Sequence, residues 1–277
     1  MINNIYKKYR FLIARRISQI SIIVLYIIAN LYGINILMGN LSSSLVAKTI
    51  PLSDPYAVLQ MFFAGAVISF DILLGAFFIL IFYMIVGGRA FCSWVCPVNM
   101  ITDLANYLRR KFGFNQIQKK QPASRNIRYW VIAISLVISF FMGVAAFELV
   151  SPISMVHRGI IFGLGFGWAA MLVIFLFDLF VLKNGWCGHI CPLGGFYSLV
   201  GRFSLIRVHH NADNCTACMK CKEVCPENQV LHMITKTSIP VLSGECTNCG
   251  RCVEVCDDDA LNFSIKNLKK ENKNEVR

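Results

Sequence analysis

Four long apolar stretches dominate the chain. Residues 17–47, 72–88, 129–147 and 159–177 contain no Asp, Glu, Lys or Arg. A helix that crosses a bilayer needs about 20 mostly apolar residues, with a range of about 17–25. The pattern therefore predicts an α-helical membrane protein with four transmembrane helices, roughly at 17–38, 68–88, 129–147 and 160–182. Buried helices of a soluble protein are the alternative, but covering four of them would need a much larger chain.

The composition agrees with this interpretation. Of the 277 residues, 56% are hydrophobic and only 15% are charged, whereas soluble domains have about 25% charged residues. The first apolar stretch is longer than the core of a cleaved secretory signal, which has about 7–15 residues. Nor do we expect Arg15-Arg16 to act as a twin-arginine export signal, because no soluble domain follows that would need export.

Basic residues in the connecting segments predict the orientation. Segments 1–16, 39–67, 89–128 and 148–159 contain 5, 1, 8 and 1 Lys or Arg residues. Because segments rich in Lys and Arg stay in the cytoplasm, we expect both termini and segment 89–128 to be cytoplasmic. The net charge of +12 is then largely a topology signal, and we expect no nucleic-acid partner.

Eight of the twelve cysteines form two runs near the end of the sequence. The first run has the spacing C-x2-C-x2-C-x3-C, is followed by Pro226, and consists of Cys215, Cys218, Cys221 and Cys225. The second repeats this spacing at Cys246, Cys249, Cys252 and Cys256. Such runs are typical of ferredoxins with two [4Fe–4S] clusters, in which the fourth cysteine of each run binds the other cluster. The module is expected on the cytoplasmic side, where disulfides are rare.

This rule predicts two ligand sets. The first cluster would be bound by Cys215, Cys218, Cys221 and Cys256. The second would be bound by Cys246, Cys249, Cys252 and Cys225. Zinc is the alternative, but zinc sites usually have C-x2-C pairs separated by a spacer. Asp257, where the first run has proline, can also begin a turn, and the acidic run 257–259 is expected to be a solvated loop.

A second motif, C-x3-C-P, occurs at the end of two of the predicted transmembrane helices. It contains Cys92 and Cys96 in the first copy and Cys187 and Cys191 in the second. On a helix, residues i and i+4 share one face, so each pair is expected to present two sulfur atoms together. The two pairs could form one four-sulfur site, form reversible disulfides, or remain thiols. We treat the four as a candidate redox relay.

Ionisable residues near the predicted outer side form a further candidate site. They are Asp71, Glu148, His157 and Arg158. A quinol releases protons when it releases electrons, so its site needs a proton acceptor such as a carboxylate or histidine. These four residues are our sequence-based candidate quinol site, with ordinary loop charges as the alternative. Asp178 is expected to pair with Lys183 or with a backbone group.

The combination of motifs resembles the NapH-type membrane subunit of periplasmic nitrate reductase systems. The resemblance covers almost the whole chain and rests on segments 91–97, 186–195 and 152–159 together with the eight ferredoxin cysteines. It implies a multi-pass protein of the bacterial inner membrane that acts as a component of a quinol dehydrogenase. Its implied partners are the quinol pool, a periplasmic NapG-type iron–sulfur protein, and a downstream cytochrome c and nitrate reductase.

Other families share this architecture. A NosR-like protein would need a large outer domain, for which the predicted outer loops are too short. A CcoG-like copper reductase or oxidase-assembly factor is expected to have an extra span and a further C-terminal domain. A membrane redox sensor is a third alternative. Any electron conductor of this type must also cross a hydrocarbon core about 30 Å thick, and the sequence leaves open whether the C-x3-C-P cysteines or mobile quinone does so.

These expectations divide the chain into four parts. Residues 1–16 would be a basic cytoplasmic N-terminus, 17–200 the four-helix transmembrane domain, 201–265 the ferredoxin-like domain and 266–277 a disordered polar tail.

Overall fold

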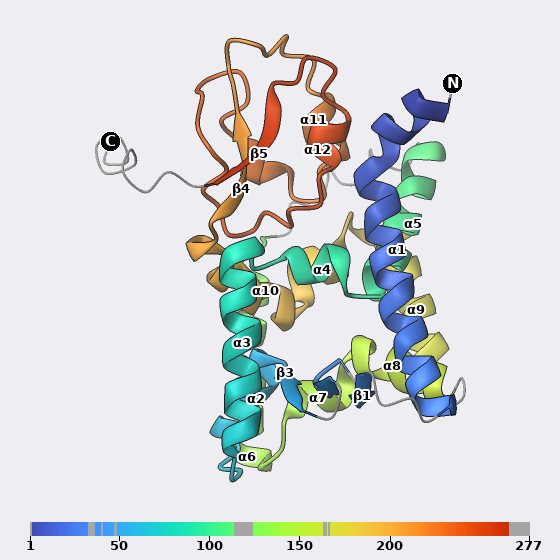
Figure 1. The fold of residues 1–277 in the computed structure, drawn as a ribbon, viewed down its shortest axis with the longest axis vertical. Coiled ribbons are helices and arrows are strands. Elements are labelled where there is room, and N and C mark those ends of the chain that lie inside the picture. Colours follow the sequence, from blue (N-terminus) through green and yellow to red (C-terminus); the bar gives the residue numbers. More distant parts are fainter. Residues whose placement is uncertain are drawn as a thin grey trace.

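The computed structural model describes residues 2–32, 37–39, 41–46, 49–113, 124–162, 165 and 167–265. The predicted polar tail, 266–277, lies outside the described residues. A ferredoxin-like module sits at one end of a group of long helices, and a layer of short helices lies between the two (Figure 1).

Each of the four apolar stretches forms a helix. They are α1 (Ile2–Tyr32), α3 (Phe70–Val86), α6 (Ile127–Met142) and α9 (Gly167–Leu176), which continues as the π-helical η2 (Phe177–Val181). Among the described residues, only one segment, Tyr9–Ala29 of α1, is both long and apolar enough to cross a membrane by itself. The other three are apolar helices of 10–17 residues.

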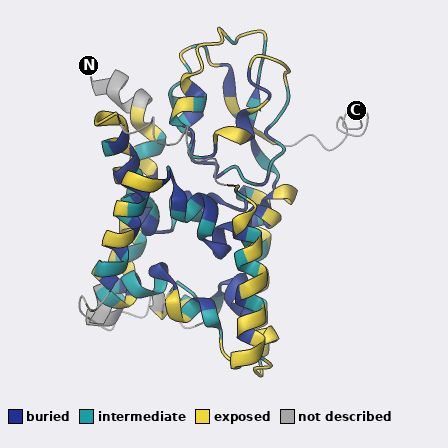
Figure 2. Cartoon of the chain, turned by 180° about the vertical axis from the view of Figure 1, so that it is seen from behind, coloured by how far each residue is buried: buried dark blue, intermediate teal, exposed yellow. Residues whose placement is uncertain are grey.

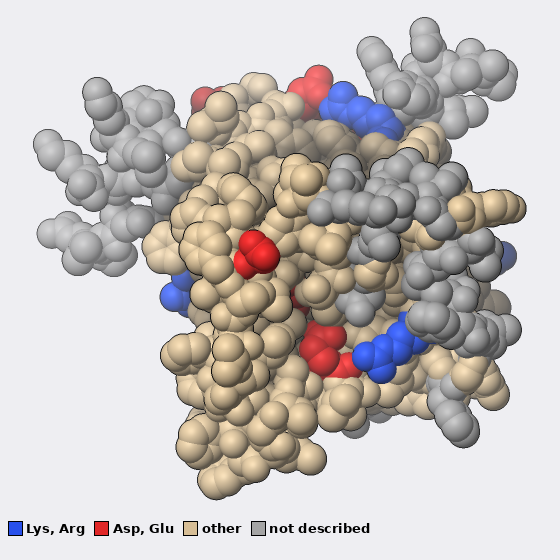
Figure 3. Space-filling view, turned by 60° about the horizontal axis from the view of Figure 1, so that its bottom comes forward, with Lys and Arg blue, Asp and Glu red and all other residues tan. Residues whose placement is uncertain are grey.

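The outer surfaces of these helices are apolar. Large side chains that are more than half exposed include Phe77 on α3 (58%), Trp130 and Phe141 on α6 (71% and 80%) and Val173 on α9 (65%). Figure 2 shows exposed residues on the outer faces of α1 and α3 and buried ones toward the middle. When the end opposite the module is turned forward, most of the visible described surface is uncharged (Figure 3). Exposed apolar surface of this kind marks a contact with a membrane, another protein or a ligand.

A small antiparallel sheet lies between the long helices, in a region that was predicted to be the end of the span 17–38 and the loop after it. Its strands are β1 (Leu37–Gly39), β2 (Ser43–Val46) and β3 (Ile50–Ser53), in that order. Strand β3 packs closely on α3 because Gly75 has no side chain: a Cβ there would lie 2.8 Å from the Pro51 carbonyl oxygen. Three short helices complete this half: α2 (Pro55–Phe63), α7 (Ala146–Val150) and α8 (Pro152–Phe162).

The layer next to the module is built from the segments that follow α3 and η2. It contains α4 (Ala90–Trp94), α5 (Val98–Lys111), the π-helical η3 (Trp186–Ile190), α10 (Pro192–Val200) and the 3-10 turn η4 (Gly201–Phe203). A buried apolar cluster joins this layer to the long helices and includes Tyr83, Phe91 and Tyr197.

The module itself has little regular structure, because most of its chain winds around cysteines. Strands β4 (Ile206–His210) and β5 (Leu261–Ile265) pair antiparallel, with Val208 opposite Phe263. Between them lie α11 (Lys220–Val224), the 3-10 turn η5 (Asn228–Leu231) and α12 (Arg251–Glu254). The short helices α11 and α12 each begin within one cysteine run, and cysteines from both runs belong to the module's core.

Candidate metal centres

One enclosed cavity in the module is lined by four cysteines from both runs. They are Cys225, Cys246, Cys249 and Cys252. Three of them belong to the second run and the fourth closes the first run, which is the ligand set that the spacing predicts. The rest of the wall is mostly apolar, with residues such as Val208 and Leu231, and also includes Glu227 and Arg251. Four cysteines that line one cavity are a donor set that fits a [4Fe–4S] cluster.

The other four cysteines of the module are also neighbours. Burial raises the pKa of Cys221, and nearby Cys218, Cys256 and Cys215 raise it further, so these thiols lie within electrostatic range of one another. Among the described residues, no three His, Cys, Asp or Glu side chains converge as the ligands of a single metal ion do.

The cysteine loops are shaped by left-handed backbone conformations. Ala217 and Met219 in the first run and Asn248 in the second have φ values of 60°, 60° and 47°. Gly250 has φ 75°, and a Cβ there would lie 2.4 Å from the Phe11 ring of α1. Other residues in these loops adopt this conformation too, but at position 250 only glycine also leaves room for α1.

The acidic residues after the second run stay at the surface, as expected for a solvated loop. The carboxylate of Asp257 pairs with Lys220 at 2.7 Å, and both side chains are more than half exposed. The neighbouring Asp258 accepts a hydrogen bond from Thr216 at 2.5 Å. These two contacts join the end of the second run to the first. Asp257, which stands where the first run has Pro226, therefore holds this loop through an ion pair.

The four C-x3-C-P cysteines line another small cavity, next to the module. The wall contains Cys92, Cys96, Cys187 and Cys191. All four are free thiols. Burial is the main reason why the pKa of Cys191 is raised to about 12, and burial raises the pKa of Cys96 and Cys187 as well. As free thiols these three would stay protonated, whereas a bound metal would deprotonate its thiol ligands outright.

The local geometry of these motifs differs from the continuous helical face expected from the sequence. Helix α4 ends at Trp94, before Cys96, and the second motif is a π-helical turn that ends before Cys191. Cys191 is extended (φ −62°, ψ 113°) because Pro192 disfavours a helical conformation in the residue before it. The turn is held by Asp178, whose carboxylate accepts a hydrogen bond from the Trp186 amide at 3.1 Å. Of the two partners expected for Asp178, the backbone group is therefore the one found.

A third small cavity joins the two cysteine sites. Its lining includes Cys92 and Cys187 of the C-x3-C-P motifs and Cys249 of the module, together with polar and charged residues such as Arg89 and Glu227. The same cysteines also line the two cavities described above. The candidate sites are therefore contiguous, and the C-x3-C-P cysteines lie directly beside the module.

A buried ion network holds this junction together. The carboxylate of Glu227 accepts a hydrogen bond from Arg89 at 2.6 Å, and the two side chains are 2% and 1% exposed. Arg125 also pairs with Glu227, and an Nη of Arg128 lies 3.8 Å from it. Arg128 pairs in addition with Glu245. Burial and the neighbouring Arg89 and Arg128 lower the pKa of Arg125 to about 10, so this guanidinium group is still charged at neutral pH.

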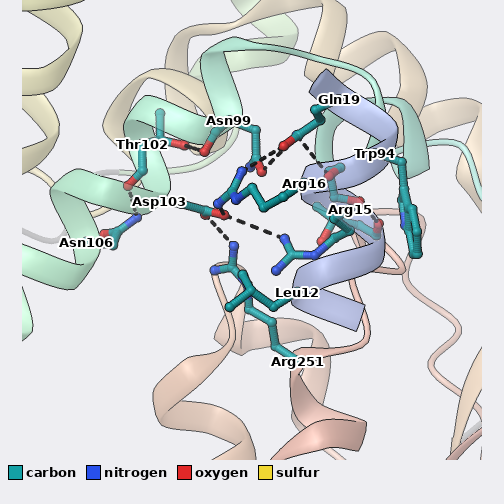
Figure 4. Close-up of polar contacts among 12 residues, drawn as sticks. Leu12, Arg15, Arg16, Gln19, Trp94, Asn99, Thr102, Asp103, Asn106 and Arg251 are labelled. Carbon is teal, nitrogen blue, oxygen red and sulfur yellow. Dashed lines mark hydrogen bonds and ion pairs between the residues drawn. The ribbon is translucent and has the colours of Figure 1, made fainter. Parts of the chain in front are cut away.

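A second network ties α1 and α5 to the module. The carboxylate of Asp103 on α5 pairs with Arg15 and Arg16 of α1 and with Arg251 of α12 (Figure 4). Gln19 of α1 adds hydrogen bonds to the carbonyls of Ser93 and Cys96, each at 3.1 Å. The three elements that meet here are distant in sequence.

Sequence reasoning missed these networks, although a signal was present. Arg89 lies three residues before Cys92, and Glu227 comes directly after Cys225-Pro226. Charged residues next to a cysteine motif in an apolar chain are expensive to bury and need partners. Asp103 gave no such signal, because it lies in a segment with many charges.

The structure separates the four residues of the sequence-based quinol site into two kinds. Asp71 lies in the first turn of α3 and Arg158 lies on α8, and both are exposed. Glu148 accepts hydrogen bonds from Ser42 at 2.6 Å and Ser154 at 2.9 Å. His157 is only 4% exposed and packs edge-on against the Tyr26 ring, with centroids 4.6 Å apart. Glu148 and His157 therefore face the interior, whereas Asp71 and Arg158 face outward.

Two family models match the chain. One, described as a 4Fe-4S binding domain, matches residues 68–115 and 164–209, which contain both C-x3-C-P motifs. The other, described as a 4Fe-4S dicluster domain, matches residues 207–257. Both matches therefore fall on the segments that contribute the cysteine-lined cavities.

Several known proteins are similar over most of their length. The methylamine utilization ferredoxin-type protein MauN of Methylorubrum extorquens is 44% identical over 234 residues, which cover 83% of this chain and 80% of MauN. The ferredoxin-type protein NapH of Haemophilus influenzae is 44% identical, with 80% of this chain and 77% of NapH covered. NapH of Escherichia coli is 41% identical, with coverages of 82% and 78%. No solved structure matches the chain.

Proposed function

Because the chain belongs to the family of NapH and MauN ferredoxin-type iron–sulfur proteins, we propose that it is the quinol-oxidising membrane subunit of an electron-transfer complex. The observation that carries this proposal is the contiguity of the cysteine-lined cavities, which extend from the helical part of the protein into the module. Such an arrangement suits conduction of electrons better than a sensor with one isolated site.

The cysteines are assigned to clusters as the spacing predicts. We propose that one [4Fe–4S] cluster is bound by Cys215, Cys218, Cys221 and Cys256, and a second by Cys246, Cys249, Cys252 and Cys225. The shared cavity of the second set supports this exchange of fourth ligands. Clusters bound there would carry single electrons.

The four C-x3-C-P cysteines form the third site of the proposal. The cavity that they line and the 4Fe-4S model that matches both motifs support iron–sulfur ligation over a disulfide pair or inert thiols. Their place beside Cys249 makes them a relay between the helical part and the module. The role of the protein in this relay is to keep the cysteines dry and to fix the module against them through Glu227 and its arginines.

We propose that the helical part spans the bacterial inner membrane four times, with both termini in the cytoplasm. The apolar outer surfaces of α1, α3, α6 and α9 support this topology, as do the alternating basic segments. Helices α3, α6 and α9 are 10–17 residues long. The bilayer adapts to spans of this length by local thinning and by oligomerisation of the protein.

The proposal also names the proteins that receive the electrons. We propose that the quinol pool supplies electrons, which reach a periplasmic NapG-type iron–sulfur partner, a cytochrome c and a nitrate reductase. Similarity to NapH supports the nitrate system. Similarity to MauN is as high, so a methylamine-utilisation system is the second candidate. The part common to both is the ferredoxin-type electron carrier.

Iron analysis and electron paramagnetic resonance of the anaerobically purified protein test the proposal. Two ferredoxin clusters and a third at the C-x3-C-P site would give about twelve iron atoms per chain, and the ferredoxin clusters alone about eight. Addition of a menaquinol analogue to the protein in lipid nanodiscs should then reduce the clusters. A protein that binds iron but is not reduced by quinol, and instead reduces Cu(II), would belong to the copper-reductase alternative.

A further inference from the structure

A mostly apolar cavity of about 210 Å³ lies among the helices, next to the C-x3-C-P site. In Figure 1, α1 and α3 stand on either side of it, β3 closes one end and α4 the other, with the module beyond α4. Its wall is formed largely by apolar side chains, including Ile22, Leu52 and Ile79. Cavities of this size and character, with few polar groups, are typical of binding sites for small apolar molecules.

The main polar group in the wall is a buried carboxyl. Asp54, which is 9% exposed, lies between β3 and α2 and accepts a hydrogen bond from the Tyr197 hydroxyl at 3.0 Å. It also caps α2, because one of its oxygens accepts a hydrogen bond from the Tyr56 amide at 3.4 Å. The rings of Tyr26 and Tyr83 line the same cavity. A carboxyl and a phenol side by side in an apolar cavity can bind a molecule with a few hydroxyl groups.

The cavity is also in contact with the redox site. The ring of Phe91 lines this cavity and the four-cysteine cavity alike, and Cys92 follows it in the chain. Phe91 stacks on Tyr197 with ring centroids 5.3 Å apart and meets Tyr83 at 6.0 Å. A molecule bound beside Tyr197 would therefore be separated from the cysteines by about one side chain.

An apolar molecule could reach the cavity from the membrane. Helices α1 and α3 each contribute side chains to the wall of the cavity. The outward faces of both helices are apolar. A long hydrocarbon tail could leave between them into lipid, which a water-soluble substrate would not require.

We propose that this cavity binds the headgroup of a benzoquinol or naphthoquinol, with Asp54 and Tyr197 hydrogen-bonded to its hydroxyl groups. This inference rests on the proposed function and gives it a substrate site that differs from the sequence-based one. Oxidation of one quinol breaks two O–H bonds and releases two electrons and two protons. Cys92, Cys96, Cys187 and Cys191, beyond Phe91, would hold the iron–sulfur group that accepts these electrons one at a time. The Asp54 carboxylate takes the protons in turn and releases each to water on the Glu148 side.

The electrostatics of Asp54 suit this role. Burial, with Glu148 nearby, raises the pKa of Asp54 to about 7, so the group exchanges protons readily at neutral pH. Glu148 is held by the Ser42 and Ser154 hydroxyls and is half-buried, so it can lead a proton from Asp54 toward solvent. Asp71 of the sequence-based candidate site is exposed at the first turn of α3 and does not line this cavity.

Binding of a fluorescent quinol analogue, 2-heptyl-4-hydroxyquinoline N-oxide, tests the proposal without electron transfer. The variants are Asp54→Asn and Tyr197→Phe, in full-length protein in lipid nanodiscs. Asparagine caps helices as well as aspartate does, so Asp54→Asn should fold. Loss of one hydrogen bond should weaken binding about tenfold in each variant. Tyr129→Phe is the matched control, because it removes a hydroxyl contact with Ser198 (2.7 Å) outside the cavity wall, and its affinity should stay within about twofold of the wild type.

Reduction of the clusters by a menaquinol analogue and by dithionite separates the possible failures. The proposal expects slow reduction by quinol but normal reduction by dithionite in Asp54→Asn. If quinol reduces the wild type and both cavity variants equally fast and they bind the analogue equally, the site assignment is overturned while the proposed function stands. A loss confined to Asp71→Asn would also overturn it. If quinol does not reduce even the wild type, the proposed function itself fails.

Discussion

Replacing Glu227 by glutamine should loosen the module from the helical part. Glu227 is 2% exposed and its carboxylate lies within ion-pair distance of three arginines, of which Arg89 is 2.6 Å and Arg128 is 3.8 Å away. The third, Arg125, pairs with it as well. Glutamine keeps the shape and one hydrogen-bond acceptor but removes the charge. The buried Arg89 and the half-buried Arg125 would then lose their carboxylate partner, whereas Arg128 would keep Glu245.

The cost can be judged from buried ion pairs in general. Removing one partner of such a pair destabilises a protein by about 3–5 kcal/mol. Because the arginines regain water when the module separates, this cost acts on the docked state. It corresponds to a change of about two to three and a half powers of ten in the docking equilibrium.

Hydrogen exchange at the junction measures this change. The Leu205 amide donates to the Met84 carbonyl at 3.2 Å, so its exchange rate reports separation of the module from α3. In Glu227→Gln we expect this rate to rise at least about a hundredfold, with the dithionite-reducible clusters retained. Asp257→Asn is the control, because it breaks an exposed pair of the same module that contributes little. An unchanged Leu205 exchange rate in Glu227→Gln would refute the role of the network.

Three further predictions concern the redox path. Cys187→Ser should lower the iron content by about four atoms per chain and block quinol-driven reduction while leaving the ferredoxin signals; full iron content would contradict the four-cysteine site. Cys225→Ser should weaken the signal of the cluster bound by Cys246, Cys249 and Cys252. If Cys256→Ser weakened that signal and Cys225→Ser did not, the assignment of the fourth ligands would be reversed. The rate of quinol-driven reduction should rise as the pH increases through about 7, because the raised pKa of Asp54 leaves it protonated, and unable to accept a proton, below that pH; a stopped-flow pH series in which Asp54→Asn keeps the same rise would contradict this.

The long apolar runs of the chain predicted the helices well, because a run of this length and composition is typically helical. Helices α3 and α6 largely coincide with the predicted spans, whereas α1 ends at Tyr32 rather than at 38 and α9 begins at Gly167 rather than at 160. Among the described residues, only α1 contains a segment long enough to span a membrane alone. Cysteine spacing was equally informative: the three cysteines of the second run and Cys225 share a cavity, as the rule for two-cluster ferredoxins requires.

What the sequence could not give depends on contacts between distant residues. Glu227 and Arg89 are 138 positions apart, and Asp54 and Tyr197 are 143 apart. Asp54 reads as an ordinary helix cap before Pro55, and nothing local shows that α10 brings a tyrosine to it. The strands β1, β2 and β3 have only three or four residues each, which is too short for alternation to be recognised.

The helical ends at the C-x3-C-P motifs show the same limit. The i, i+4 rule assumes a continuous helix, yet the proline in each motif ends the helix before the second cysteine. The four sulfur-bearing residues still meet at one cavity, because Asp178 and Gln19 hold the turns from neighbouring helices. The four cysteines therefore line one cavity without the continuous helical face that the rule assumes.

Anaerobic stopped-flow reduction of the purified protein in nanodiscs by a menaquinol analogue tests the central claim most directly, with the visible absorbance of the iron–sulfur centres as the readout. If electrons enter beside Phe91 and travel through the C-x3-C-P cysteines to the module, the wild type should bleach rapidly and Cys187→Ser should not, although dithionite bleaches both. Equally fast bleaching of the two proteins by quinol would contradict the path described for this chain.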